Sequence, residues 1–357
     1  MSNSKLNKTK KEKNDEFYTQ YVDIEKELQH YNIEGKTIYC NCDNPHYSNF
    51  YKYFKDKFNT HKIKHLYCTG YNKDGNGYYA EYNGTEETIK TLNGNGSFDS
   101  DECKQIMQEC DIVITNPPFS LFRDYVAQLM EYGKKFLVLA NNNAITYKEF
   151  FPYIKNGQIW LGRTLFTGKM PFFKVPNDYP LENDRFEKRA VGLYKQVNSI
   201  CWFTNMHHIK PNKSIILTKT YNPIDYPHFD NYDAINVDKV KDIPIDYDGI
   251  MGVPITFLQY YNPSQFEIIG MAAGNSAVNH FGDLAKYTKH KNDKGGCGVV
   301  NGERVYARLL IKKNDSLEQV EFEIIAQMAN TNVDEYNFGY PFVFGKKKYA
   351  RILIKRR

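Results

Sequence analysis

The sequence Asp111-Ile-Val-Ile-Thr-Asn-Pro-Pro-Phe119 joins a short apolar run to two consecutive prolines. Residues 111–115 are mostly apolar and β-branched, which predicts a buried strand. The prolines end it, because each fixes its own φ and holds the residue before it out of helical space. Neither proline has an N–H, so the carbonyls of Asn116 and Pro117 form a stiff turn of acceptors beside the flat ring of Phe119. Such a turn suits a planar group that carries an amine.

The place of this turn in the chain favours a ligand site. Open α/β sheets bind ligands at the carboxyl ends of their strands, and the turn follows a predicted strand. The next residues predict a helix over 121–130, with Ser120 as its cap. An ordinary corner between a strand and a helix would also account for two prolines, so the pattern alone leaves both interpretations open.

Strand and helix patterns alternate through the first 206 residues. Residues 78–82 and 85–92 flank Asn83-Gly84 and predict an inserted hairpin. The alternation predicts an α/β fold with a doubly wound, mainly parallel sheet. The other predicted strands cover 35–43, 63–69, 111–115, 136–140, 159–161 and 199–204, and the predicted helices cover 23–31, 46–58, 101–110, 121–130 and 147–154.

Three regions depart from this alternation. Residues 1–14 are polar and basic, and they predict a disordered tail. Residues 162–190 mix glycine, proline, aromatic and basic residues, among them Lys169 and Lys174, and predict a long loop without regular structure. Residues 207–357 form a second, mixed region with strand-like patches.

The second region contains an internal repeat, in which residues 302–313 match residues 345–356. Each copy predicts a strand that ends in basic residues. Arg308 and Lys312 of the first copy recur as Arg351 and Lys355 of the second. The pattern fits two edge strands with solubilising charges, and it equally fits a pair of basic β-ribbons that face a nucleic acid.

Composition excludes several classes of protein. Of the 357 residues, 41% are hydrophobic and 25% are charged, and the net charge of +5 permits nucleic-acid binding without requiring it. The seven cysteines form no Cys-x-x-Cys pair, which indicates reduced thiols in a cytoplasm and neither a disulfide framework nor a metal site. We expect no signal peptide and no membrane span, because no apolar run approaches about 18 residues.

Two further segments are candidates for binding. Phe17-Tyr18-Thr19 precedes a predicted helix, where helix amides can meet a carboxylate, although a packed capping turn is an equal alternative. The turn formers Asn41 to Pro45 follow the first predicted strand. They lie between a strand and a helix, as in half of a βαβ unit.

Taken together, these segments resemble the adenine-specific DNA methyltransferases of the EcoRI type, a family with a Rossmann-like sheet and a separate target-recognition region. The resemblance spans most of the chain in one order. It rests on Asp15-Glu-Phe-Tyr-Thr19, Cys40-Asn-Cys-Asp-Asn-Pro45, Ser48-Asn-Phe50, Gly96-Ser-Phe98, the run from Asp111 to Phe122, Gly252-Val-Pro-Ile-Thr-Phe-Leu258 and Tyr261-Asn-Pro-Ser-Gln-Phe-Glu-Ile-Ile-Gly270.

The resemblance implies methyl transfer from S-adenosylmethionine to the exocyclic amine of a flipped adenine in duplex DNA, without a metal. It divides the chain into a catalytic domain over 15–206 and a target-recognition region over 207–357. It assigns catalysis to Asn116, Pro117, Pro118 and Phe119. It assigns cofactor binding to Phe17, Tyr18, Thr19, Asn41, Asp43, Pro45, Phe98, Asp99 and Asn116. Contacts with DNA phosphates are expected from Lys169, Lys174, Arg308, Lys312, Arg351 and Lys355.

The chain departs from the common methyltransferase pattern at three places. No Gly-x-Gly follows the first strand, although the EcoRI type lacks it too. The second strand ends Tyr67-Cys-Thr-Gly70 without the acid that often holds the ribose, and Asp99 substitutes for an acid expected where Ser97 stands.

The pattern leaves other substrates and settings open. A methyltransferase of RNA bases or of protein glutamine, and a DNA-binding protein without catalytic activity, are the alternatives. The expected setting is the cytoplasm, on the nucleoid DNA, in restriction–modification or phage defence. A cognate restriction endonuclease is a further candidate partner there.

Overall fold

The computed structural model of the chain describes residues 19–164, 172–175, 186–189, 192–196, 199–209, 212–229, 232–273, 298–300, 303–305, 340–343 and 346–357. The predicted tail (1–14) and most of the first copy of the repeat lie outside them. Internal contacts divide the chain into two compact units, Met1–Ala144 with Gly157–Pro211 and Ile145–Asn156 with Asn212–Arg357. The functional boundary expected after residue 206 stays a prediction.

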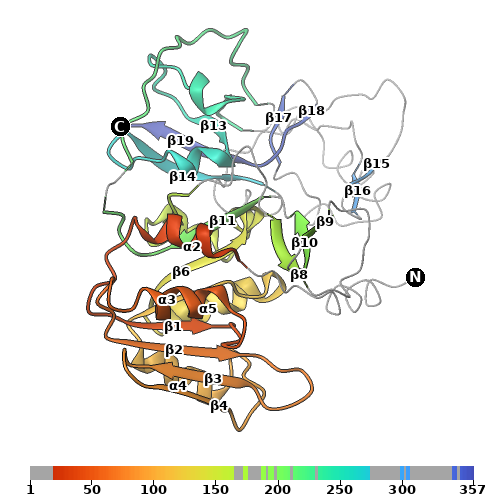
Figure 1. The fold of residues 1–357 in the computed structure, drawn as a ribbon. Coiled ribbons are helices and arrows are strands. Elements are labelled where there is room, and N and C mark those ends of the chain that lie inside the picture. Colours follow the sequence, from red (N-terminus) through yellow and green to blue (C-terminus); the bar gives the residue numbers. More distant parts are fainter. Residues whose placement is uncertain are drawn as a thin grey trace. The chain divides into compact units, whose positions relative to one another are not determined.

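An eight-stranded mixed sheet organises the first unit, with the strand order β4-β3-β2-β1-β5-β6-β11-β7 (Figure 1). The pairs β1–β2, β1–β5 and β5–β6 are parallel, and the pairs on both flanks are antiparallel. The α/β class is confirmed, and the parallel part is limited to the centre. The strands are β1 (Thr37–Asn41), β2 (His65–Gly70), β3 (Tyr78–Tyr82), β4 (Glu87–Thr91), β5 (Ile112–Thr115), β6 (Lys135–Asn141), β7 (Trp160–Leu161) and β11 (Ile200–Thr204).

The parallel centre has a topological switch point between β1 and β5. After β1 the chain passes through α3 (Asn49–Asp56) to β2 on one side, and after β5 it passes through α5 (Phe122–Glu131) to β6 on the other side. Because such crossovers are right-handed, the two helices cover opposite faces of the sheet. The carboxyl ends of β1 and β5 therefore border a crevice of the kind that binds ligands in doubly wound folds.

The starts of the helices follow capping chemistry. Helix α3 begins at Asn49, three residues later than predicted, because the Ser48 side chain accepts the backbone N–H groups of Phe50 and Tyr51. Ser120 does not cap α5, contrary to the prediction. A 3₁₀ turn, η1 (Phe119–Leu121), precedes that helix instead, and Leu121 N donates to Pro118 O at 3.0 Å. The remaining helices are α2 (Tyr21–Leu28), α4 (Asp101–Glu109) and the 3₁₀ turn η2 (Asn142–Thr146).

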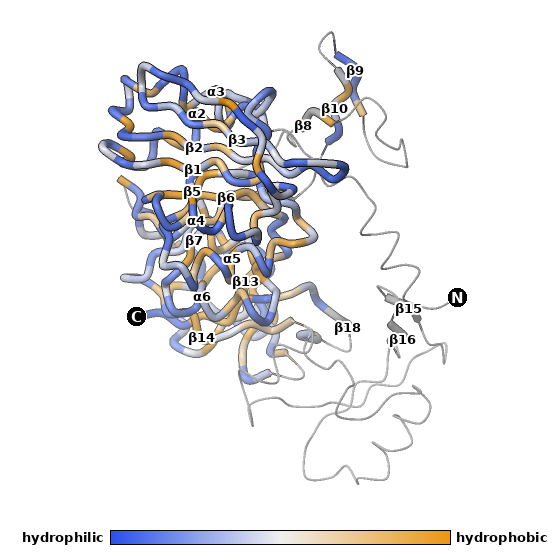
Figure 2. Tube along the Cα trace, turned by 90° about the horizontal axis from the view of Figure 1, so that it is seen from below, coloured by the Kyte–Doolittle hydropathy of each residue, from blue (hydrophilic) through white to orange (hydrophobic). Residues whose placement is uncertain are grey.

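The central strands and α3 supply the core of the first unit. Figure 2 shows hydrophobic residues gathered along the central strands, and all four residues of β5 are buried. Phe50, Phe54 and Phe58 lie four residues apart and are buried on one face of α3 and its extension. Phe50 meets Trp202 of β11 edge to face, with ring centroids 6.1 Å apart. This packing fixes α3 on the sheet, and with it the loop that joins β1 to α3.

Part of the predicted loop over 162–190 is strand. A three-stranded antiparallel sheet in the order β8-β10-β9 contains β8 (Phe172–Val175), β9 (Phe186–Arg189) and β10 (Gly192–Gln196). The prediction of a loop without regular structure is therefore wrong for β8 and β9. Lys174 lies in β8 opposite Tyr194, and Lys169 falls outside the described residues.

A second sheet organises the second unit, in the order β12-β13-β19-β14. Strand β19 contains most of the second copy of the repeat, and it lies between β13 and β14. The interpretation of this copy as an edge strand is therefore wrong. Helix α6 (Phe151–Lys155) lies against β14. The elements are β12 (Ile235–Asn236), β13 (Met251–Pro254), β14 (Phe266–Ala272), β19 (Arg351–Arg356), the 3₁₀ turns η3 (Val240–Asp242) and η4 (Ile255–Gln259), and the short pairs β15 (Gly298–Val300) with β16 (Glu303–Val305) and β17 (Phe342–Val343) with β18 (Lys346–Lys347).

Candidate functional site

The carboxyl ends of β1 and β5 are joined by the side chain of Thr115. Thr115 is fully buried at the end of β5, directly before Asn116. Its Oγ1 lies 2.5 Å from Oδ2 of Asp43 and also contacts the backbone oxygen of Asn41. The structure thus brings together the loop after the first strand and the Asn-Pro-Pro-Phe turn, which are more than 70 residues apart in sequence.

Asp43 is the centre of this network. Ser48 donates its hydroxyl to Oδ1 of Asp43 at 2.7 Å, so both carboxyl oxygens have side-chain partners. The backbone N–H of Asp43 donates to Thr69 O at 2.8 Å, which ties the loop to the end of β2. Burial raises the pKa of Asp43 to about 7, against the opposing effect of the hydrogen bonds from Thr115 and Ser48.

The hydroxyl of Thr115 lies within reach of two acceptors. A hydroxyl carries one hydrogen, so Thr115 can donate to only one of the two oxygens at a time. The carboxylate of Asp43 and the backbone oxygen of Asn41 therefore share this donor.

The loop after β1 adopts a glycine-like conformation without glycine. Cys42 has a φ of +67°, in the left-handed region that most residues avoid. It stands between Asn41, which is fully buried, and Asp43. Strain of this kind persists where the surrounding structure holds it, and it gathers at functional sites. Pro45, in the same loop, is buried as well.

Gly70 explains why the second strand ends without an acid. A Cβ at Gly70 would lie 2.8 Å from the Cα of Asn44 and 3.1 Å from the carbonyl oxygen of Asp43. The end of β2 therefore packs backbone to backbone against the loop after β1, and no side chain fits there. A ligand group that an acid would otherwise hold must be met by another residue.

Thr19 approaches the same loop from the N-terminal side. Asn49, the first residue of α3, donates from Nδ2 to Thr19 O at 2.7 Å. Among the described residues, Thr19 Oγ1 and Asn41 Nδ2 are buried without a hydrogen-bond partner. Buried polar atoms are almost always paired, so these two atoms are candidates for hydrogen bonds with a polar ligand. Phe17 and Tyr18 lie outside the described residues.

Phe98 and Asp99 differ in exposure. Phe98 is buried edge to face on Tyr125, with ring centroids 5.0 Å apart, and Gln128 Nε2 donates to its carbonyl oxygen at 3.1 Å. Asp99 is exposed and accepts the hydroxyl of Ser97. The backbone in front of them is held by Glu102, whose carboxylate accepts the N–H of Gly94 at 2.8 Å.

The residues of the turn after β5 differ in burial. Pro117 is buried, whereas Asn116, Pro118 and Phe119 are half-buried. Phe119 packs at the edge of the core that contains α2 and α3. The turn is thereby held from two directions, by the buried β5 before it and by the packed ring of Phe119 after it.

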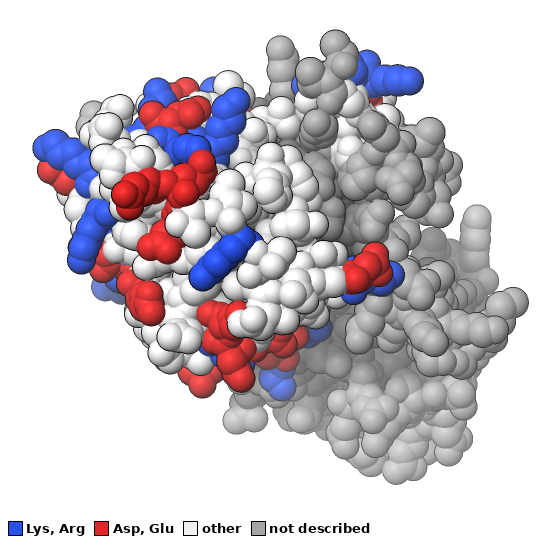
Figure 3. All heavy atoms as spheres, turned by 60° about the horizontal axis from the view of Figure 1, so that its bottom comes forward, with Lys and Arg blue, Asp and Glu red and all other residues white. Residues whose placement is uncertain are grey.

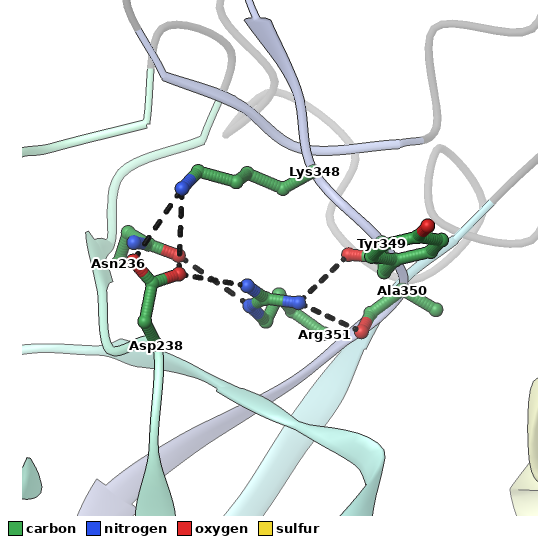
Figure 4. Close-up of polar contacts among 6 residues, drawn as sticks. All are labelled: Asn236, Asp238, Lys348, Tyr349, Ala350 and Arg351. Carbon is green, nitrogen blue, oxygen red and sulfur yellow. Dashed lines mark hydrogen bonds and ion pairs between the residues drawn. The ribbon is translucent and has the colours of Figure 1, made fainter.

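Arg351 of the second unit is engaged inside the protein. Its guanidinium donates to Asp238 at 3.1 Å, to Tyr349 O at 3.2 Å and to Asn236 Oδ1 at 3.4 Å, and Lys348 Nζ lies 3.4 Å from the same Asp238 carboxylate (Figure 4). The side chain of Arg351 is 8% exposed, and burial lowers its pKa while Asp238 opposes that effect. The structure gives Arg351 a structural partner, and its contact with DNA stays a prediction.

The other basic residues expected to contact DNA are distributed differently. Lys355 is exposed near the end of β19, and Lys174 lies in β8. Lys169, Arg308 and Lys312 lie outside the described residues. On the face shown in Figure 3, the described basic and acidic side chains are interspersed. That face therefore offers no continuous basic surface among the residues described.

Sequence reasoning missed the residues that join the segments of the site. Thr115 was counted only as part of a strand, because a β-branched residue in an apolar run carries no sign of a polar role. Ser48 and Asn49 belonged to a motif but had no role assigned to them. A serine directly before an aromatic helical run is a capping signal, and it could have identified Ser48.

The described residues contain neither a metal-binding cluster nor a membrane-spanning helix. No group of three or more His, Cys, Asp or Glu side chains in that part of the chain is placed to hold a metal ion. No helix formed by the described residues is long and apolar enough to cross a membrane.

Comparison with known proteins identifies the family. The Type II methyltransferase M.EcoRI of Escherichia coli is 44% identical over 335 residues, covering 87% of this chain and 97% of that protein. The Type II methyltransferases M.MpnI of Mycoplasma pneumoniae and M.MgeORF184P of Mycoplasma genitalium are 40% and 38% identical, covering 87% and 86% of this chain and 99% and 98% of their own lengths. No solved structure matches the chain. Residues 5–314 match the family described as adenine-specific methyltransferase EcoRI, and the chain belongs to that family.

Proposed function

We propose that this protein transfers a methyl group from S-adenosylmethionine to the exocyclic amine of an adenine in duplex DNA. The observation that carries the proposal is the bond network of Thr115, Asp43 and Asn41 at the switch point. It places the loop expected to bind the methyl donor beside the turn expected to bind the amine. The names of the relatives, all Type II methyltransferases, support the same reaction.

The residues present fit the cofactor. S-adenosylmethionine is polar along its length, and Thr19 Oγ1 and Asn41 Nδ2 are buried donors without partners among the described residues. We assign them to the cofactor together with Asp43 and Pro45 of the same loop. Phe17 and Tyr18 complete the expected set on the N-terminal side, and Phe98 and Asp99 on the side of α4.

The turn after β5 is assigned to the amine. The amine donates hydrogen bonds to the Asn116 side chain and to the Pro117 carbonyl, which stabilise the positive charge that grows on nitrogen during transfer. Pro118 keeps the acceptors in place, since its fixed φ resists reorganisation. S-adenosylmethionine would supply the methyl group as a sulfonium and leave as S-adenosylhomocysteine. The methylated amine would then lose one proton to solvent, and no covalent nucleophile from the protein is needed.

The adenine must leave the duplex to reach this turn. Flipping costs a few kcal/mol, and stacking on Phe119 recovers part of that cost. Basic residues hold the flanking phosphates, which makes affinity depend on salt. We assign this role to Lys355 and Lys174 among the described residues, and to Lys169, Arg308 and Lys312. The buried guanidinium of Arg351 is engaged with Asp238 and is not assigned a phosphate. The proposed setting is restriction–modification in the cytoplasm, with a cognate endonuclease as the partner enzyme.

Transfer of a labelled methyl group tests the proposal. Duplex DNA, RNA and protein are offered separately with methyl-labelled S-adenosylmethionine, and the product nucleoside is identified by mass spectrometry. We expect N6-methyladenine from duplex DNA alone. The variant Asn116→Ala should lose activity while calorimetric binding of S-adenosylmethionine remains. Label in RNA or protein only, or full activity of the variant, would contradict the proposal.

A further inference from the structure

We infer that Thr115 is a positioning residue, whose hydroxyl couples the loop from Asn41 to Asp43 to the position of Asn116. The inference rests on the proposed function and adds a residue to its machinery. Thr115 is not among the residues assigned to the cofactor or to the adenine. It acts through the residues on both sides of the switch point, one of which follows it directly in the chain.

The covalent link from Thr115 to the turn is short and stiff. Asn116 is the next residue, and the two prolines after it remove most of the freedom with which the backbone could absorb a shift. Thr115 is also the last residue of β5, paired in parallel register with Val138 of β6. A displacement of Thr115 toward or away from β1 is therefore passed on to the acceptors of the turn.

The noncovalent link from Thr115 to the loop runs through its hydroxyl, which can donate to either of two acceptors there. The oxygen lies 2.5 Å from Oδ2 of Asp43 and contacts Asn41 O, so one side chain spans the two ends of the three-residue loop. Asp43 passes the link on to α3 through Ser48 at 2.7 Å. Valine has the shape of threonine but no hydroxyl, so it would leave Asp43 and the backbone oxygen of Asn41 without this donor.

Thr204 of β11 provides a matched control. It is also fully buried in the same sheet, and its hydroxyl donates to Phe136 O at 2.6 Å and accepts Met206 N at 3.0 Å. The replacement Thr204→Val removes a comparable pair of hydrogen bonds without touching the loop or the turn. A structural role alone would make the two valine variants alike.

The experiment measures kcat, the KM for S-adenosylmethionine and the melting temperature of Thr115→Val, Thr115→Ser and Thr204→Val. A misplacement of reacting groups by about 1 Å can cost roughly a hundredfold in rate. We expect a loss of that order in kcat for Thr115→Val, near-normal kcat for Thr204→Val, and similar falls in melting temperature for both. Thr115→Ser should restore most of the activity, because it keeps the hydroxyl.

The outcomes separate this inference from the proposed function. Equal kcat in Thr115→Val and Thr204→Val, or a serine variant as slow as the valine variant, would overturn the inference. A wild-type protein that does not methylate adenine in duplex DNA would overturn the proposed function and the inference with it. If Thr115→Val does not fold, Thr115→Cys applies the same test, since a thiol is a weaker donor. A cysteine variant as fast as wild type would then overturn the inference.

Discussion

The hydroxyl of Ser48 donates to the carboxylate of Asp43 at 2.7 Å and also accepts the first amides of α3. One side chain thus caps a helix and holds the residue at the centre of the site. The position of α3 is set by the hydrophobic core through Phe50 and Phe54, both buried. Packing in the core is thereby transmitted to Asp43, and from Asp43 to Thr115.

Replacing Ser48 by alanine should damage binding more than stability. Loss of an N-cap costs about 1 kcal/mol in unfolding free energy. Because Asp43 also loses a partner, we expect the affinity for S-adenosylmethionine, measured by calorimetry, to fall at least tenfold. Ser100→Ala is the control, since Ser100 caps α4 by accepting Cys103 N. It should cost similar stability without a change in affinity, and equal loss of affinity in both variants would contradict the role of Ser48.

The pKa of Asp43 predicts how stability depends on pH. The folded pKa of about 7 lies above the usual carboxyl value near 4, so the folded protein binds more protons between these pH values than the unfolded chain does. The contribution of Asp43 to stability is therefore fully present below about pH 4 and is lost as pH rises to about 7. The difference in unfolding free energy between wild type and Asp43→Asn should fall over that interval and then level off.

Denaturant titrations of wild type and Asp43→Asn at pH 4, 5.5, 7 and 8 provide the measurement. A difference in unfolding free energy that stays constant or rises with pH would contradict the raised pKa of Asp43. The titratable neighbours do not complicate the interval, because burial raises the pKa of each of them and keeps them neutral. These neighbours are Cys40, Cys42, Cys68 and Tyr125.

The left-handed backbone of Cys42 predicts that the protein is more stable with glycine at this position than with a β-branched residue. Glycine adopts a φ of +67° without strain, whereas a β-branched residue is strongly disfavoured there. We expect Cys42→Gly to keep or raise the unfolding free energy, and Cys42→Val to lower it by about 1–2 kcal/mol. Cys201→Val is the control, because Cys201 lies in strand β11, where β-branched residues are favoured. A valine at 42 tolerated as well as a valine at 201 would contradict this account.

Local patterns predicted the first unit well, because its strands and helices each bury a continuous apolar face. The hairpin over 78–92 and the parallel pairing of β1 with β2 followed from turn residues and from the strand–helix order. The antiparallel flanks were harder to foresee. Strand direction at a sheet edge depends on tertiary packing, which an apolar run such as residues 199–204 does not encode.

Two features could not be predicted from the sequence. They are the copy of the repeat that enters the sheet of the second unit, and the contact between Thr115 and Asp43 in the site. Residues 302–313 and 345–356 are identical at seven of twelve positions, so the local sequence gives little indication of which copy lies between β13 and β14. The contact of Thr115 with Asp43 spans 72 residues, and it depends on the register of β5 against β1. A resemblance to a family can indicate that both segments matter, but only their placement shows the bond between them.

The ion pair of Arg351 with Asp238 predicts unequal effects when either partner is removed. The side chain of Arg351 is 8% exposed and that of Asp238 is 58% exposed. Asp238→Ala removes the ion-pair partner of the buried Arg351 guanidinium. This loss should lower the unfolding free energy by about 1–3 kcal/mol. Arg351→Met leaves a carboxylate that water can reach and fills the space of the arginine, so its effect should be close to zero. Denaturant unfolding of both variants and of the double variant measures the difference. An arginine variant that is the more damaged of the two would show that the guanidinium contributes through its backbone contacts with Tyr349 and Ala350, and not mainly through Asp238.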